Sequence, residues 1–128
     1  MAYEPWSLAD LADRIAAEDG VDRRYKLVLE FVRGYLDEPV STRGALLSRR
    51  PSLIGDPGWD AVVAGLADHY AFHDEQPPPT WTSEPERFCF PPFLPVDNLG
   101  VRVMARVHSP AGFLRHGVLL MPEDLQPV

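Results

Sequence analysis

The sequence predicts an α+β fold that is predominantly helical, with about four N-terminal helices, a small two-stranded C-terminal β element and short helical turns. Two observations indicate it. Apolar residues recur at helical spacing through residues 7–74. Most of the fourteen prolines follow residue 76, and proline favours loops because it fixes φ and lacks an N–H donor. We expect one domain over residues 1–128, with a helical part at 7–74 and a proline-rich loop and small α/β part at 75–128.

The first two predicted helices cover residues 7–18 and 21–36. Ser7 is expected to cap the first, because Asp10 stands three residues later and can complete a capping box. The second helix has an unusually broad apolar face, which predicts a central core helix buried on more than one side. The alternative is a partner-binding face, as in a homodimer. That face comprises Tyr25, Leu27, Val28, Leu29, Phe31, Val32, Tyr35 and Leu36.

Two further helices are expected before residue 74. Residues 41–50 follow Pro39 and are predicted to form a short helix. The next helix begins at Asp56-Pro57, since aspartate is a good N-cap and proline suits the first helical position. Its apolar residues follow the spacing of an amphipathic helix and are interpreted as core: Trp59, Val62, Val63, Leu66, Ala67 and Tyr70.

The second half alternates loops with short elements. Residues 77–79 are expected to be extended as polyproline II, and Ser83 to cap one helical turn over residues 84–88. Residues 101–108 alternate apolar and polar side chains, which predicts a strand that pairs with residues 118–121. A short helix is expected between Ser109-Pro110 and Gly117, and one last turn over residues 122–125.

The charge and the single cysteine exclude several classes of protein. A formal net charge of −7 opposes direct nucleic-acid binding, which needs clustered cations, and suits a protein that covers a basic partner surface. Cys89 is alone, so neither an intrachain disulfide nor a multi-cysteine metal site is expected. No apolar stretch is long enough to span a membrane and no signal-peptide pattern is present. We therefore expect a cytoplasmic protein without a membrane association.

Residues that carry chemistry are sparse. His69 and His73 stand four residues apart, so a small metal-binding protein or enzyme is an open alternative. The HExxH pattern is absent because Tyr70 follows His69, and we favour both histidines as neighbours of the core. Asp56 and Asp60 are interpreted as a cap and a solvated carboxylate. We expect no catalytic residue, metal or cofactor.

Four segments resemble a group of small actinobacterial proteins associated with nucleotidyltransferase toxin modules. Their pattern has a GDPRWDALLAGLAEHLA helix, a P-x-W and EPxRF turn, a W/F-F-P segment and a terminal SPAxFRRHGIFL. The matching residues here are Gly55 to Ala71, Pro79 to Phe88, Pro91 to Phe93 and Ser109 to Leu120, and the resemblance covers residues 25 to 125. Many such proteins sit at or beside a helix-turn-helix half, which this chain lacks.

The resemblance implies a non-enzymatic antitoxin-like protein that neutralises a nucleotidyltransferase-type toxin by direct contact. Its partner would then be a protein, encoded by an adjacent gene. A stand-alone homodimeric interaction domain is the alternative. Aromatic residues and arginine dominate protein interfaces, so the candidate protein-binding residues are those of the loop-rich half: Trp81, Phe88, Phe93, Phe113 and Arg115.

Overall fold

The computed structural model describes residues 5–95, 109–120 and 122–125, and this part of the chain is mostly helical. Its α-helices are α1 (Leu8–Ala16), α2 (Val21–Asp37), α3 (Val40–Ser48), α4 (Pro57–His73) and α6 (Ala111–Arg115). Short 3-10 turns follow at η1 (Thr80–Ser83), η2 (Pro85–Arg87) and η3 (Pro122–Leu125). The predominantly helical prediction is therefore confirmed for the described residues.

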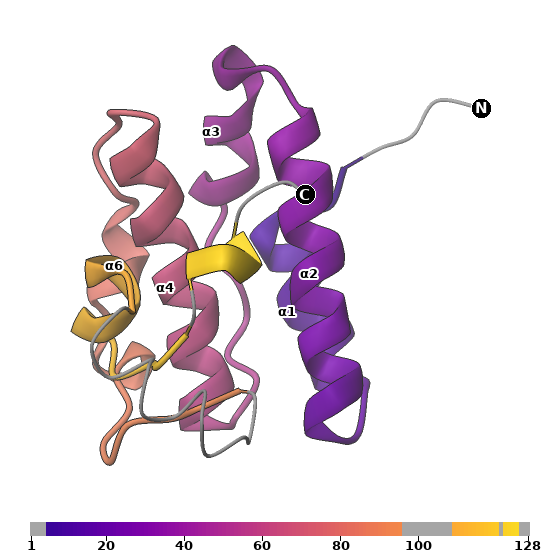
Figure 1. Cartoon of the computed structure of the whole chain (residues 1–128), viewed down its shortest axis with the longest axis vertical. Coiled ribbons are helices and arrows are strands. Elements are labelled where there is room, and N and C mark those ends of the chain that lie inside the picture. The colour runs from indigo at the N-terminus through magenta and orange to yellow at the C-terminus, as the bar shows by residue number, and fades with distance from the viewer. Residues whose placement is uncertain (1–4, 96–108, 121, 126–128) are drawn as a thin grey trace.

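Helix α4 lies at the centre, with α1 and α2 on one side and α6 on the other (Figure 1). Thirteen of its residues are buried, including every residue from Gly58 to Asp68. The prediction that the 21–36 helix is the central one was wrong. The reason is that α4 carries small residues outside its apolar stripe, and small side chains let neighbouring elements approach closely.

Two glycines of α4 show how close these approaches are. A Cβ atom added to Gly65 would lie 2.5 Å from the Phe113 ring of α6, and one added to Gly58 would lie 2.6 Å from the Phe93 ring. Carbon atoms pack no closer than about 3.5 Å without repulsion. Glycine at these two positions is therefore required for the aromatic rings to contact the backbone of α4.

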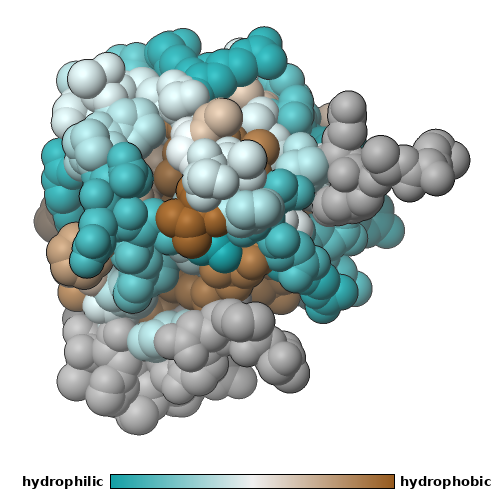
Figure 2. Space-filling model, turned by 90° about the horizontal axis from the view of Figure 1, so that it is seen from above, coloured by the Kyte–Doolittle hydropathy of each residue, from teal (hydrophilic) through white to brown (hydrophobic). Residues whose placement is uncertain are grey.

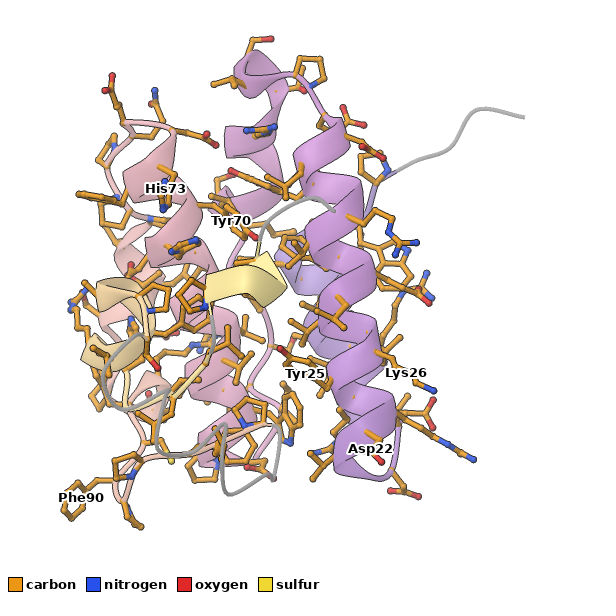
Figure 3. The ribbon with its side chains drawn as sticks, viewed as in Figure 1. Asp22, Tyr25, Lys26, Tyr70, His73 and Phe90 are labelled. Carbon is orange, nitrogen blue, oxygen red and sulfur yellow. The ribbon has the colours of Figure 1, made fainter. Side chains whose placement is uncertain are left out.

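Helix α2 faces the core with one side only. Val28, Phe31, Val32 and Tyr35 are buried, and Tyr35 packs against Tyr70 of α4 with ring centroids 4.7 Å apart. Lys26 lies on the side of α2 away from α4 (Figure 3), and Asp22 is exposed as well. The apolar face of α2 is used within the fold, so it does not favour a homodimer through that face.

Two of the three predicted helix caps are confirmed. Ser7 Oγ accepts from Asp10 N at 3.1 Å, and Ser7 N donates to Asp10 Oδ2 at 3.0 Å, which is a complete capping box. Asp56 Oδ1 accepts from Gly58 N at 3.0 Å, with Pro57 at the first helical position of α4. At residue 83 the prediction was wrong, because Glu84 precedes η2 and no side chain caps this turn.

The C-terminal part differs from the predicted β element. Val118 forms an isolated parallel bridge with Phe93, and the described residues contain no strand. The predicted partner strand at 101–107 lies outside the described residues, so that pairing stays a prediction. Leu120 N instead donates to Ser109 Oγ at 2.7 Å. The predicted turn at 122–125 is present as η3, where Leu125 O accepts from the Tyr70 hydroxyl at 2.9 Å.

One hydrophobic cluster contains buried side chains from Leu8 to Leu125. It therefore includes residues of both the helical part and the proline-rich part. Among the described residues, no helix has the length and apolar character needed to cross a membrane.

Candidate binding groove

A groove of about 510 Å³ opens between the C-terminal half of α4, Pro78 and the start of α6. We call it the α4–α6 groove. Apolar side chains form much of its surface: Phe72, Pro78, Pro110 and Ala111. Ligand sites in proteins usually occupy roughly 300–1,000 Å³ and combine an apolar lining with a few polar groups. The α4–α6 groove matches this description.

Phe72 is the most unusual residue of the groove, because 79 % of it is exposed. It stands in the last turn of α4 and on the opposite side of the helix from the stripe that begins at Trp59. Its neighbour His73 lies at the same end of α4 in Figure 3. The helix thus leaves the core at its C-terminus and presents an aromatic ring to solvent.

The other wall of the groove is held against α4 by Gly112. A Cβ atom at this position would lie 2.9 Å from the backbone nitrogen of His69. Helix α6 therefore rests directly on the backbone of α4, with Phe113 buried beneath it. Both walls of the groove are consequently fixed relative to each other by close packing.

His69 and His73 border the groove, with ring centroids 4.4 Å apart. Burial, followed by the charge of His73, lowers the pKa of His69 to about 4, so this ring is neutral at neutral pH. Among the described residues, no group of three or more His, Cys, Asp or Glu side chains is placed to hold a metal ion. The pair provides two nitrogen ligands at most, and a zinc site usually has three or four protein ligands.

A buried polar cluster underlies the α6 wall. His116 Nε2 lies 2.6 Å from Asp68 Oδ2, and Arg115 Nη1 donates to the same oxygen at 2.8 Å. Burial alone raises the pKa of Asp68, but its hydrogen bond to His116 and the charges of His116 and Arg115 outweigh this and lower it. Asp68 is therefore ionised and ties α4 to the end of α6.

His116 has acceptors on both sides. Its Nδ1 lies 2.7 Å from the carbonyl oxygen of Arg87, and its Nε2 faces the Asp68 carboxylate. His116 is fully buried, and the Phe88 ring stacks on it with centroids 4.5 Å apart. The cluster thus joins one imidazole and one guanidinium to a single carboxylate.

Asp60 is 3 % exposed, so the prediction of a solvated carboxylate was wrong for this residue. Its oxygens accept from Ile54 N at 2.7 Å and from Gly55 N at 3.2 Å. Arg87 Nη1 lies 3.7 Å from Asp60 Oδ1. Asp60 therefore fixes the loop before α4 and balances a buried cation.

Arg87 is fully buried and connects distant parts of the chain. Its Nη2 donates to the Pro51 carbonyl at 2.6 Å, and its Nε to Glu84 Oε1 at 3.2 Å. Its own carbonyl accepts from His116. The EPxRF residues thus hold the 84–88 segment between the loop before α4 and the end of α6, which is a structural role.

A smaller hollow of about 280 Å³ lies between α3 and residues 77–81. At its side the Tyr35 hydroxyl donates to Asp74 Oδ2 at 2.7 Å, and Arg43 Nη1 to Asp74 Oδ1 at 3.2 Å. Burial and the Asp74 carboxylate raise the pKa of Tyr35, so the hydroxyl stays protonated. The side chains of Tyr35, Arg43 and Asp74 thus join the ends of α2, α3 and α4. Figure 2 views the molecule from the α3 end and shows hydrophobic residues reaching the surface among hydrophilic ones.

Of the five residues predicted to bind a partner, three are engaged within the fold. Trp81 is buried and its Nε1 donates to the Leu47 carbonyl at 3.1 Å. Phe113 is fully buried, and Phe93 packs edge-on against Trp59 with centroids 5.3 Å apart. Packing within the fold therefore accounts for these three large side chains.

The other two predicted residues, Phe88 and Arg115, lie together at the surface. The Arg115 guanidinium is 5.7 Å from the Phe88 ring centroid, and its side chain is 48 % exposed. Arg115 borders the α4–α6 groove, whereas Phe88 covers His116 beside it. Arg115 is the predicted residue that the structure places in a candidate site.

The sequence pattern did not predict Phe72 as a binding residue, nor the Asp68–His116 pair. A signal existed for Phe72, since a large aromatic residue opposite an apolar stripe has no core to enter. No comparable signal existed for Asp68 and His116, because 48 residues separate them.

Searches of protein families, curated proteins and solved structures give no match to this chain. Its function therefore has to be inferred from the groove, the buried cluster and the charge.

Proposed function

We propose that this chain is a non-enzymatic binding protein, an antitoxin-like partner that neutralises a nucleotidyltransferase-type toxin by direct contact in the cytoplasm. The observation that carries the proposal is Phe72, which is 79 % exposed in an apolar groove beside the half-exposed Arg115. Burying a phenylalanine side chain contributes roughly 1.5–3 kcal/mol. Aromatic residues and arginine are also the residue types that carry most of the energy of protein interfaces.

The negative net charge of the chain supports a partner that has a basic surface. A toxin that acts on RNA needs a basic surface, because affinity for nucleic acid comes largely from phosphate contacts. A protein with net charge −7 is attracted to such a surface and associates with it faster than a neutral protein.

The polar clusters support binding rather than chemistry. Asp68 and His116 face each other and the Arg87 carbonyl, and Arg87 itself is enclosed between Pro51 and Glu84. Each of these groups has a partner that accounts for it within the fold. Asp68 lines the α4–α6 groove, but its Oδ2 is engaged by His116 and Arg115.

The resemblance to the antitoxin-associated proteins supports the same proposal. Two of its segments, Gly55 to Ala71 and Ser109 to Leu120, contain α4 up to its last turn and α6. Those two helices form the walls of the groove. Phe72 and Pro78 lie outside the matching segments, so the resemblance extends to the two helices and not to these two lining residues.

The test is co-expression with the product of the adjacent gene. We expect the two proteins to co-elute in size-exclusion chromatography, and expression of this chain to restore growth to cells that express the adjacent product. Separate elution of two folded proteins, or a toxic neighbour whose effect this chain does not relieve, would refute the proposal. If the adjacent gene product is not toxic but still co-elutes, the binding role stands and the antitoxin role is refuted.

A further inference from the structure

We propose that the α4–α6 groove binds a segment of the partner protein that packs an apolar side chain on Phe72 and pairs a carboxylate with Arg115. The proposal rests on the proposed function in taking a protein as the occupant. It adds the chemistry of the bound segment, which the resemblance does not supply.

The apolar part of the groove can recognise side chains of the partner but not its backbone. Pro78 and Pro110 have no N–H groups, so they cannot donate to an added strand. Their rings and the exposed Phe72 ring present flat apolar surface instead. Recognition at this part of the groove must therefore come from burying an aromatic or aliphatic side chain of the partner.

The charge at the α6 wall differs in sign from the net charge of the chain. Arg115 is the one arginine or lysine among the described residues that line the groove, and its side chain is 48 % exposed. The chain as a whole carries −7. A carboxylate of the partner is the complementary group at this point.

Arg115 is held in place before any partner binds. Its Nη1 donates to Asp68 Oδ2 at 2.8 Å and its Nη2 to Ser83 Oγ at 3.3 Å, while its guanidinium lies near the Phe88 ring. A guanidinium has five N–H donors, so donors remain for a carboxylate. Because the side chain is already ordered, binding costs less conformational entropy.

The remaining lining residues do not oppose an anionic segment. Asp68 is the one carboxylate among the described residues that line the groove, and Arg115 and His116 already engage it. His69 is neutral at neutral pH. The overall charge of the chain then brings a basic partner close, while the groove fixes which segment docks.

The test is panning of a random dodecapeptide phage library on the immobilised full-length chain at neutral pH. We expect enriched peptides to share an aromatic or large aliphatic residue at a fixed spacing from Asp or Glu. Enrichment of basic peptides, or of none, would overturn the proposal.

The consensus peptide is then synthesised with a fluorescent label, and its affinity is measured by anisotropy. Phe72→Ser and Arg115→Gln are each expected to weaken binding at least about tenfold. Replacing the acidic residue of the peptide by its amide should weaken binding to the wild type and have little further effect on Arg115→Gln. Leu114→Ser is the control, because Leu114 is exposed on α6 and does not line the groove.

Thermal melting of each variant shows whether it is folded, and Arg115→Lys keeps the charge if Arg115→Gln fails to fold. Peptide binding that is unaffected by Phe72→Ser would place the site elsewhere and overturn the proposal. Failure of the adjacent gene product to bind would refute the proposed function alone, because the peptide results do not depend on that protein.

Discussion

The imidazole of His116 and the carboxylate of Asp68 meet at 2.6 Å in the interior and join the two helices that form the walls of the α4–α6 groove. Asp68 belongs to α4, and His116 directly follows α6. This contact also orders Arg115, which shares Asp68 Oδ2. The geometry of the groove is thus linked to the buried contact between His116 and Asp68.

Replacing His116 by alanine should destabilise the fold strongly. The change leaves the Arg87 carbonyl without its donor, removes the 2.6 Å contact to the buried Asp68 carboxylate and opens a cavity under Phe88. We expect the free energy of unfolding in urea to fall by about 3 kcal/mol. His73→Ala is the control and should change it by less than about 0.5 kcal/mol, because His73 is exposed. Equal losses of unfolding free energy in the two variants would contradict a structural role for the buried His116 contacts.

The stability of the chain should fall in mildly acidic solution because of His69. Its pKa is about 4 in the fold against an ordinary 6.5, so between these pH values the unfolded chain binds a proton that the folded chain does not. The free energy of unfolding is then highest above pH 6.5 and declines as the pH falls towards 4, by up to about 3 kcal/mol. Urea unfolding at a series of pH values measures this.

The variant His69→Leu isolates this contribution, because it keeps an apolar side chain of similar size without a titrating ring. We expect its free energy of unfolding to vary less between pH 6.5 and pH 4 than that of the wild type. The same slope in both proteins would show that His69 titrates normally.

Gly65 and Gly44 provide a matched pair of helical glycines. Alanine has the higher helix propensity, so Gly44→Ala, whose added Cβ meets nothing within 4 Å, should stabilise the fold by about 0.5–1 kcal/mol. At Gly65 the Cβ would overlap the buried Phe113 ring, so Gly65→Ala should destabilise by about 1–3 kcal/mol. Thermal melting compares the two. Adding Phe113→Leu to Gly65→Ala should cost less than the two separate losses combined.

Chelation should leave the protein unchanged. His69 and His73 lack a third ligand among the described residues, so we expect EDTA to leave the melting temperature as it was and metal analysis to find no stoichiometric ion. A melting temperature that falls on chelation and recovers with added zinc would instead establish the metal-binding alternative.

Local signals in the sequence predicted the helices well, but they did not predict contacts between residues that are far apart in the sequence. Ser7 with Asp10, and Asp56 with Pro57, are close in sequence, so capping chemistry alone places the starts of α1 and α4. The burial of Asp60 depends on Arg87, which arrives 27 residues later, and no pattern in the sequence marks such a pair. A carboxylate near a helix start is satisfied equally well by water until the fold brings its partner.

The central position of α4 was missed for a related reason. The stripe from Trp59 to Tyr70 predicts one buried face, but the other faces hold alanine and glycine, which the pattern of large apolar residues does not count. Only the contacts show that Gly58 and Gly65 receive aromatic rings. Likewise Trp81 and Phe113 have the residue types of interface anchors, and only their burial reveals a core role.

The central claim is that this chain acts by binding a partner through the α4–α6 groove. The most direct test is calorimetric titration of the adjacent gene product into the wild type, into Phe72→Ser and into Leu114→Ser. Phe72 and Leu114 are both exposed, but only Phe72 lines the groove. We predict that the wild type and Leu114→Ser bind with similar affinity and that Phe72→Ser binds at least about tenfold more weakly. Equal affinity for all three proteins, or no heat of binding to the wild type, would contradict the claim.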